Sequence, residues 1–390
     1  MITIFTSSHK IYSLRNESFK NGFTWRAAPL RTMPIKRKVE GAPAATTPMK
    51  RKAEHASLYT DAVAKDEYLT LQQVLDAKMA NADLRSVIST MFDACATIAG
   101  MLREELVTVA DKQASVFGDV QLGVDMLADQ LLWDTCRNEP LIKTAASEEE
   151  PEVREMHAQG QFCICWDPLD GSSIVDNNWA VGTIIGVWPS ATGIIGATGR
   201  DQVASLVANY GPRTTVYVTL DDGVYEFTHG AKGAGGGWLC SRDGADVRIQ
   251  ANSKVFAPAN LRATQELPSY GELVHYWTAN RYTLRYTGGL VPDVCQQFTK
   301  RQGVFANPSS PSSPAKLRLA FEAAPLGLLV ERAGGKTSDG VSGGSILDVP
   351  IYAIDQRSPI CLGSSNEVDR FNATVLSCNV EPVPAQASAV

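Results

Sequence analysis

The stretch QFCICWDPLDGSS, residues 161–173, runs from a mostly apolar segment into two acids, a proline, a glycine and two hydroxyl groups. The apolar segment predicts a buried strand, and Pro168 and Gly171 are residue types that end a strand in a tight turn. We therefore expect Asp167 and Asp170 on a turn at the end of a strand. Two carboxylates this close disfavour each other's ionised form, so a cation or a proton must offset their repulsion.

The composition limits the class of protein. A chain of 390 residues, 44% hydrophobic and 20% charged, is long enough for two domains. Its net charge of −6 argues against nucleic-acid binding through the overall field, so we expect no nucleic-acid partner for the folded body. The eight cysteines are scattered without a CxxC pair, a pattern typical of a reducing compartment.

Helical periodicity appears in LTLQQVLDAKM (69–79), LRSVISTMFDACATIAGMLREEL (84–106) and QLGVDMLADQLLW (121–133). Residues 141–145 predict a short strand, and further strands are expected in TTVYVTL, DDGVYEFT and DVRIQA. The glycine-rich run 230–239 lacks the ending of a phosphate-binding loop, so we interpret it as a hairpin loop.

One uncharged segment, residues 177–199, is long enough to span a bilayer, but several glycines and a proline interrupt it. We interpret it as two buried strands, VGTIIGVW and GIIGAT, joined by a turn, and we expect no membrane partner. A turn-rich connection begins near residue 251, which predicts one domain at 66–251 and a second at 252–380.

Residues 1–57 differ from the rest of the chain, with eleven Lys or Arg against three Glu and no apolar periodicity. Their composition predicts a disordered basic tail. Three roles stay open for this tail: a solvated extension, an organelle transit peptide, or a two-part nuclear address in KRKVEGAPAATTPMKRK.

Acids cluster in three further places. A Glu triplet at 148–150 follows the short strand, Asp119 and Asp125 flank the start of a helix, and Glu322 ends the expected strand KLRLAFE. A Glu triplet is commonly a solvated run, and Asp119 also fits a helix N-cap. Taken together, carboxylates at several strand and helix ends suit Mg²⁺, which prefers oxygen ligands and often binds together with substrate phosphate. The five histidines are isolated, so phosphoester chemistry with a hard metal is expected rather than a zinc site.

The chain resembles the fructose-bisphosphatase class 1 family of metal-dependent sugar phosphatases in the order and spacing of FGDVQLGVDMLAD, SEEE, WDPLDGSSIVDNNWAVGTIIGVWP, YTLRYTGGLVPDV and KLRLAFEAAPLGLLVERAGG. The likeness covers roughly residues 66–375. RDQVASLVANYGPRTT, FAPANLRAT and TLRYTGGLVPDV resemble the branch of the family that acts on sedoheptulose 1,7-bisphosphate. The resemblance implies an α/β fold of alternating helix and sheet layers, with a metal-binding domain at 66–251 and a sugar-phosphate-binding domain at 252–380.

The implied activity is the Mg²⁺-dependent hydrolysis of the 1-phosphate of sedoheptulose 1,7-bisphosphate, with two or three ions per site, in the Calvin cycle or a pentose-phosphate-type pathway. A homo-oligomer, dimer or tetramer, is also implied. Fructose 1,6-bisphosphate stays an alternative or second substrate, because one small group changes selectivity by only about 1–3 kcal/mol. A remoter alternative is a catalytically silent regulator whose basic tail binds nucleic acid.

The resemblance also implies the roles of matching residues. The metal ligands would be Glu148, Asp167, Asp170, Glu322, the carbonyl of Leu169 and, at a further metal site, Asp119. Asp125 and Glu149 would orient and deprotonate the attacking water. The transferred phosphate would lie against Gly171, Ser172 and Ser173. The sugar and its distal phosphate would be held by Asn260, Arg285, Tyr286 and Lys316; Arg285 and Lys316 could also be plain surface cations.

The chain departs from the photosynthetic members of the family, which carry a regulatory cysteine pair just before the FGD block. The corresponding stretch, LVTVADKQASVFGD, has no cysteine, so no disulfide switch forms there. We therefore favour a cytoplasmic location and keep a plastid location, through a transit peptide, as the alternative. Asn307 stands near the place where fructose-bisphosphatases carry a tyrosine against a substrate phosphate, which agrees with a seven-carbon substrate.

Overall fold

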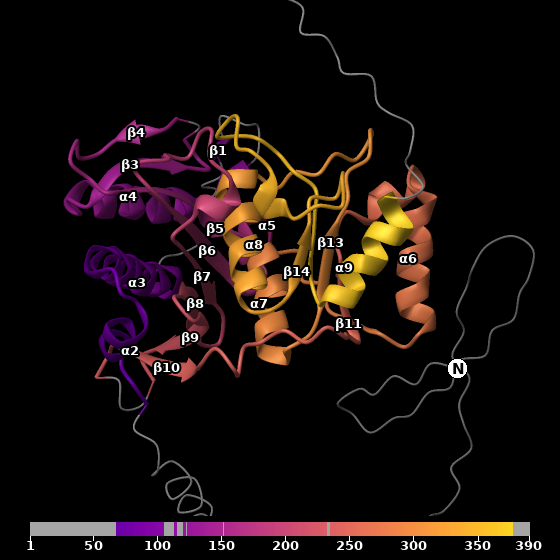
Figure 1. Cartoon of the computed structure of the whole chain (residues 1–390), viewed down its shortest axis with the longest axis horizontal. Helices are drawn as coiled ribbons and strands as arrows, with labels where there is room; N and C mark the ends of the chain where they lie inside the picture. Colours follow the sequence, from indigo (N-terminus) through magenta and orange to yellow (C-terminus); the bar gives the residue numbers. More distant parts are fainter. Residues whose placement is uncertain are drawn as a thin grey trace, which may run out of the picture. The chain divides into compact units, whose positions relative to one another are not determined.

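Two β-sheets and the helices packed on their faces carry the fold (Figure 1). The computed structural model describes residues 68–104, 113–114, 120–121, 123–150, 152–231 and 235–376. Asp119, Cys378 and the basic segment 1–57 lie outside the described residues.

The larger sheet has eight strands in the order β10-β9-β8-β7-β6-β5-β3-β4. These are β3 (Ile142–Ser147), β4 (Arg154–Glu155), β5 (Phe162–Asp170), β6 (Val181–Pro189), β7 (Ala204–Tyr210), β8 (Thr214–Leu220), β9 (Gly223–His229) and β10 (Trp238–Arg242). Neighbouring strands are antiparallel except β3 and β5, which are parallel. The glycine-rich run connects β9 to β10, and their antiparallel pairing confirms the predicted hairpin.

The smaller sheet has five strands in the order β12-β11-β13-β15-β14. These are β11 (Val255–Pro258), β12 (Thr283–Leu284), β13 (Val304–Asn307), β14 (Lys336–Ser338) and β15 (Ile360–Gly363). Strand β11 is parallel to both of its neighbours, whereas β15 is antiparallel to both of its own. A separate antiparallel pair is formed by β1 (Gln113–Ala114) and β2 (Val120–Gln121).

Helices and sheets alternate in five layers (Figure 1). The longer helices are α2 (Leu71–Lys78), α3 (Ala82–Glu104), α4 (Gly123–Asn138), α6 (Pro268–Ala279), α7 (Leu290–Lys300), α8 (Ala324–Arg332) and α9 (Ser365–Phe371). Helices α2, α3 and α4 cover one face of the larger sheet, α7 and α8 lie between the two sheets, and α6 and α9 cover the other face of the smaller sheet. This arrangement confirms the expected α/β fold of alternating layers.

Strand β5 illustrates why the larger sheet lies between two helix layers. Phe162, Ile164 and Trp166 belong to the core shared with α2, α3 and α4, whereas Cys163 and Cys165 belong to the core shared with α7 and α8. Successive side chains of a strand point to opposite faces, so an unbroken apolar run buries both faces of the sheet. The buried strand predicted from the opening stretch is therefore confirmed.

The three helices predicted from periodicity are confirmed as α2, α3 and α4. Thr70 caps α2 by accepting the N–H of Gln73, whose side chain accepts the N–H of Thr70 in return. This reciprocal pair satisfies N–H groups that a helix start leaves without partners. Helix α4 continues to Asn138, beyond the predicted end at Trp133.

The predicted strand GIIGAT is wrong. Gly193 and Gly196 have φ angles of 72° and 87°, which belong to turns rather than strands. This part of the chain forms turns, with one isolated bridge between Thr198 and Pro350. The first half of the uncharged segment is confirmed as β6. Within the part of the chain that the structure describes, every helix is too short or too polar to cross a bilayer.

Two other predicted strands are also wrong. DVRIQA (246–251) begins in a turn, in which the Asp243 side chain accepts the N–H groups of Ala245 and Asp246 at 2.9 and 3.2 Å, and none of its six residues belongs to a strand. KLRLAFE instead enters a π turn, η4 (Leu319–Ala323), that continues directly into α8.

Candidate active site

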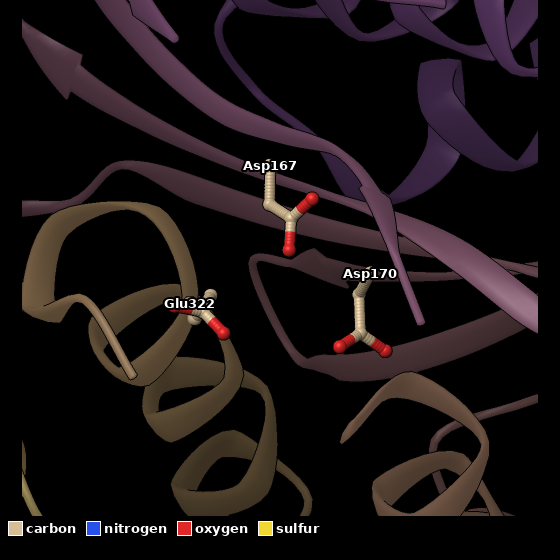
Figure 2. Close-up of side chains that lie close together, drawn as sticks. All are labelled: Asp167, Asp170 and Glu322. Atoms are coloured by element: carbon tan, nitrogen blue, oxygen red, sulfur yellow. The ribbon is translucent and has the colours of Figure 1, made fainter. Parts of the chain in front are cut away.

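Three carboxylates from distant parts of the sequence meet at the end of β5. One oxygen each of Asp167, Asp170 and Glu322 lie within 4.8 Å of one another. Figure 2 shows the two aspartates at the end of the strand and Glu322 on the helical turn that faces them. Three carboxylate oxygens at this spacing are a donor set that suits a hard divalent cation.

An irregularity in β5 directs both aspartates to the same face of the sheet. Asp167 pairs with Ile184 of β6 and Asp170 pairs with Gly182, so three steps along β5 match two steps along β6. Side chains three residues apart point to opposite faces of a regular strand, and the extra residue of a bulge removes that difference. The predicted turn at Pro168 is wrong, because β5 ends only at Asp170.

Asp170 also caps the N-terminus of α7. Its two carboxylate oxygens accept the N–H groups of Leu290 and Val291 at 3.1 and 2.6 Å. Burial raises the pKa of Asp170 to about 7, although these two N–H groups act in the opposite direction. The protonated form of Asp170 is therefore favoured up to about pH 7, and a bound cation would favour the ionised form.

Glu322 lies in η4, the π turn found in place of the expected strand. Its carboxylate accepts the N–H of Arg318 at 2.6 Å, so the side chain caps the start of its own turn. The Arg318 guanidinium forms an ion pair with Glu148 at 2.5 Å. Arg318 thereby joins Glu148, in the turn after β3, to Glu322 in the cluster.

The acids raise one another's pKa. Burial raises the pKa of Asp167 well above its usual range, and the charges of Glu148 and Asp170 raise it further. Burial and the charge of Glu148 also raise the pKa of Glu322, against the opposing effect of Arg318. One arginine cannot neutralise four acids, so protons or a further cation must complete the charge balance. Oxygen donors in excess of the local positive charge fit a divalent metal ion.

The segment predicted to hold the transferred phosphate follows Asp170 directly. Gly171 has a φ angle of 92° and precedes the short helix α5 (Ser172–Val175). A Cβ atom at Gly171 would lie 3.2 Å from the Val181 side chain, so both the backbone angle and the space favour glycine. Ser172 is partly exposed and Ser173 is exposed, so both lie at the surface beside the acids.

Asp125 and Glu149, the two residues predicted to act on water, lie on neighbouring elements. Asp125 is 2% exposed in the first turn of α4, and the N–H of Glu149 donates to the Ser147 Oγ at 3.1 Å. A short connection joins the end of α4 to the start of β3, and β3 then runs back alongside the helix. The start of α4 therefore lies toward the ends of β3 and β5. The described residues do not include Asp119, whose expected role stays a prediction.

Two residues predicted to hold the sugar phosphate follow β12. Arg285 and Tyr286 are both exposed, and the N–H of Arg285 donates to the Phe256 carbonyl at 3.0 Å. Partial burial raises the pKa of Tyr286, and the charges of Asp293 and Asp170 raise it further.

The other two predicted sugar-binding residues lie on different loops. Lys316 is exposed, two residues before Arg318. The Asn260 amide group donates to the carbonyls of Pro308 and Ser313, each at 2.8 Å. Since these bonds hold the loop at 308–313 in place, a contact of Asn260 with a sugar would use its Oδ1.

Sequence reasoning missed two buried charged residues of the site. Asp293 is fully buried in the first turn of α7 and accepts the N–H groups of Thr287 at 2.8 Å and Gly288 at 3.2 Å. Burial raises the pKa of Asp293 to about 6. Arg318 is the second. Each is a charge within a mainly apolar run, GGLVPDV and KLRLAF, and this signal could have identified both residues.

Fold and site together define a layered α/β protein that gathers carboxylates at the end of a central strand, as phosphoryl-transfer enzymes that use divalent ions do. The family model described as fructose-1-6-bisphosphatase, N-terminal domain, matches residues 67–240. The model described as fructose-1-6-bisphosphatase, C-terminal domain, matches residues 249–376. The chain therefore belongs to the fructose-1,6-bisphosphatase family, which confirms the resemblance found in the sequence.

The proteins that this chain is similar to are named for two different substrates. The chloroplastic sedoheptulose-1,7-bisphosphatase of Triticum aestivum is 49% identical over 263 residues, which cover 66% of this chain and 65% of that protein. The fructose-1,6-bisphosphatase class 1 of Geobacter sulfurreducens is 35% identical over 258 residues, which cover 65% of this chain and 79% of that protein. The chain thus matches slightly less than two thirds of the wheat protein's length and is less similar to the bacterial protein.

A solved structure extends this comparison to the fold. A crystal structure from Toxoplasma gondii, of a protein described as a sedoheptulose-1,7 bisphosphatase, has a TM-score of 0.73 and 41% sequence identity. The match covers 80% of this chain and 99% of that one.

Proposed function

We propose that the protein hydrolyses the 1-phosphate of sedoheptulose 1,7-bisphosphate with Mg²⁺, giving sedoheptulose 7-phosphate and inorganic phosphate. The observation that carries this proposal is the meeting of Asp167, Asp170 and Glu322 within 4.8 Å. Its support in the comparisons is the greater similarity to a relative named for the seven-carbon sugar than to one named for the six-carbon sugar.

The metal would be held by the three clustered acids, by Glu148, and by the carbonyl of Leu169, with Asp119 at a further position. When bound, Mg²⁺ supplies positive charge at the oxygens of the phosphate and lowers the pKa of a bound water. Two or three ions per site are proposed, since the excess of acids over the single guanidinium of Arg318 calls for more than one positive charge.

The remaining residues would act on water, phosphate and sugar. Asp125 and Glu149 would orient the attacking water and accept its proton, because a carboxylate on either side can hold a water in one position. The amides and hydroxyls of Gly171, Ser172 and Ser173 would bind the transferred phosphate. The sugar and its distal phosphate would be bound by Asn260, Arg285, Tyr286 and Lys316, in which the planar guanidinium suits a pair of phosphate oxygens.

The division of labour within the chain is also a proposal. Residues 66–251 would form the metal-binding domain and residues 252–380 the sugar-phosphate-binding domain, and the protein would assemble as a homodimer or homotetramer. The chloroplastic name of the wheat relative supports the plastid alternative for its location, whereas the missing cysteine pair supports the cytoplasm. Fusing residues 1–66 to a fluorescent protein in a photosynthetic cell tests this, because accumulation in plastids requires a transit peptide.

The activity is tested by phosphate release from sedoheptulose 1,7-bisphosphate and from fructose 1,6-bisphosphate in parallel, each with Mg²⁺ and with a chelator. We expect Mg²⁺-dependent release that favours the seven-carbon sugar. Release from the six-carbon sugar alone would keep the mechanism and replace the substrate. No release from either sugar, in protein that is folded and metal-loaded, would refute the proposal.

The remote alternative is a silent regulator that binds nucleic acid through its basic tail. Deleting residues 1–57 distinguishes this function from the phosphatase function. The regulator would be favoured if the full chain shows no phosphatase turnover and the deletion removes its binding to nucleic acid. Turnover that is unchanged by the deletion supports the phosphatase, because every predicted catalytic residue lies after residue 57.

A further inference from the structure

Asp129 lies at the centre of a buried polar network beneath the candidate active site. It is 6% exposed and lies one helical turn after Asp125, on the same face of α4. Its carboxylate accepts the indole N–H of Trp166 at 2.8 Å, the indole N–H of Trp133 at 3.1 Å, and the hydroxyl of Ser147. The two indole rings pack edge to face, with centroids 4.8 Å apart.

These three donors come from three of the elements that carry acids of the site. Trp133 lies on α4 with Asp125, Ser147 ends β3 just before the Glu triplet, and Trp166 directly precedes Asp167 on β5. Asp129 accepts one hydrogen bond from each of these three elements. Asp129 therefore joins the elements that carry Asp125, the Glu triplet and the two aspartates of β5.

The network continues into the backbone of the Glu triplet. Ser147 donates its hydroxyl proton to Asp129 and accepts the N–H of Glu149 at 3.1 Å. The preceding N–H, that of Glu148, donates to the Trp166 carbonyl at 3.0 Å. Both glutamates are thus fixed at the backbone by groups that Asp129 itself holds, either through the Ser147 hydroxyl or through the Trp166 indole.

A neutral side chain at position 129 could not accept all three of these hydrogen bonds. The carboxylate uses Oδ1 for Trp166 and Ser147 and Oδ2 for Trp133, so both oxygens are acceptors. An asparagine has one acceptor oxygen, and its NH₂ group would face an N–H or O–H donor. Because a buried donor without an acceptor is costly, the elements would shift relative to one another to satisfy it.

From these contacts we infer that Asp129 is a positioning residue, which sets Asp125 and the glutamates at 148 and 149 against the acids of β5 without touching substrate. The inference rests on the proposed function for its kinetic consequence. Its direct consequence, the geometry of the metal-binding acids, is measurable without turnover.

The test compares Asp129→Asn with Ser147→Ala and with the double variant. We expect Asp129→Asn to weaken Mg²⁺ binding, followed by tryptophan fluorescence or calorimetry, and to lower kcat, each by roughly tenfold to a hundredfold, as loss of a group that orients metal ligands does. The KM for the sugar bisphosphate should change far less at saturating Mg²⁺. Asp134→Asn, an exposed acid on the same helix, is the matched control and should behave as wild type.

The double variant separates positioning from general damage. If Asp129 acts partly through the Ser147 hydroxyl, the two single effects are not additive, and the double variant resembles Asp129→Asn. Unchanged Mg²⁺ affinity in folded Asp129→Asn, or strictly additive effects, would overturn the inference. Should Asp129→Asn fail to fold, Ser147→Ala leaves both indole bonds in place and still must weaken Mg²⁺ binding. Wild-type protein that binds Mg²⁺ but releases no phosphate would refute the proposed function and leave this test intact.

Discussion

Asp170 makes the stability of the metal-free protein dependent on pH. Burial raises its pKa from 3.8 to about 7 on folding, so the folded state binds a proton that the unfolded state has released. Stability from this group is fully present below the unfolded pKa and is lost as the pH rises through the folded pKa. The metal-free protein should therefore become less stable between about pH 5 and about pH 8.

The size of this effect follows from the shift. About two pH units separate pH 5 from the folded pKa, and each unit corresponds to about 1.36 kcal/mol, so Asp170 alone accounts for at most about 2.7 kcal/mol. Saturating Mg²⁺ should restore stability strongly near pH 8 and weakly near pH 5, because protons and the metal compete for the same oxygens.

The assay is urea unfolding of chelator-treated protein across this pH range, followed by circular dichroism. Asp170→Asn removes the titrating group and keeps one acceptor oxygen for the start of α7, so the free energy of unfolding should depend less on pH in this variant. Asp355→Asn, at an exposed acid, should keep the wild-type dependence. A metal-free wild type whose stability is constant or rises with pH, or an Asp170→Asn variant with the wild-type slope, would refute the reasoning.

Asp167→Asn removes one ligand charge with almost no change in volume, so Mg²⁺-dependent phosphate release should fall by roughly a hundredfold or more with an unchanged circular dichroism spectrum; near-normal turnover would exclude Asp167 as a ligand. Asp293→Asn loses one of the two oxygens that hold the N–H groups of Thr287 and Gly288, next to Tyr286. Its KM for the sugar bisphosphate should rise roughly tenfold or more, and a fall in kcat at unchanged KM would contradict this role. Oxidant or dithiol treatment should change turnover less than about twofold, because every described cysteine is free and nearly all are buried; large reversible activation by dithiol would show that a disulfide controls the enzyme.

The sequence by itself was sufficient for the parts of the protein that depend on local pattern. The apolar run before Asp167 predicted β5, and apolar residues spaced three and four positions apart predicted α2, α3 and α4. The chemical type of the site was also readable, because acids at the ends of elements and the absence of a histidine cluster favour a hard cation. Local propensity and side-chain chemistry are properties of neighbouring residues, so they can be read from the sequence without knowledge of the fold.

Predictions from local pattern were wrong for segments that were expected to form strands and that form turns instead. Strand propensity in KLRLAFE gave way to a π turn, because Glu322 caps the turn through the N–H of Arg318 and the segment continues into α8. At the start of DVRIQA, the Asp243 side chain accepts the N–H groups of Ala245 and Asp246 and holds the chain in a turn. Both outcomes depend on specific hydrogen bonds that residue composition does not contain.

Only the tertiary structure decided which acids lie together. The bulge in β5 directs Asp167 and Asp170 to one face, the turn in η4 brings Glu322 to meet them, and the N-terminus of α7 lies against Asp170. The roles proposed for Asp129 and Asp293 likewise depend on the donors that the structure brings to them. Residues far apart in the sequence meet because the layers bury a common core, and the free energy of that burial depends on the whole packing rather than on any one segment.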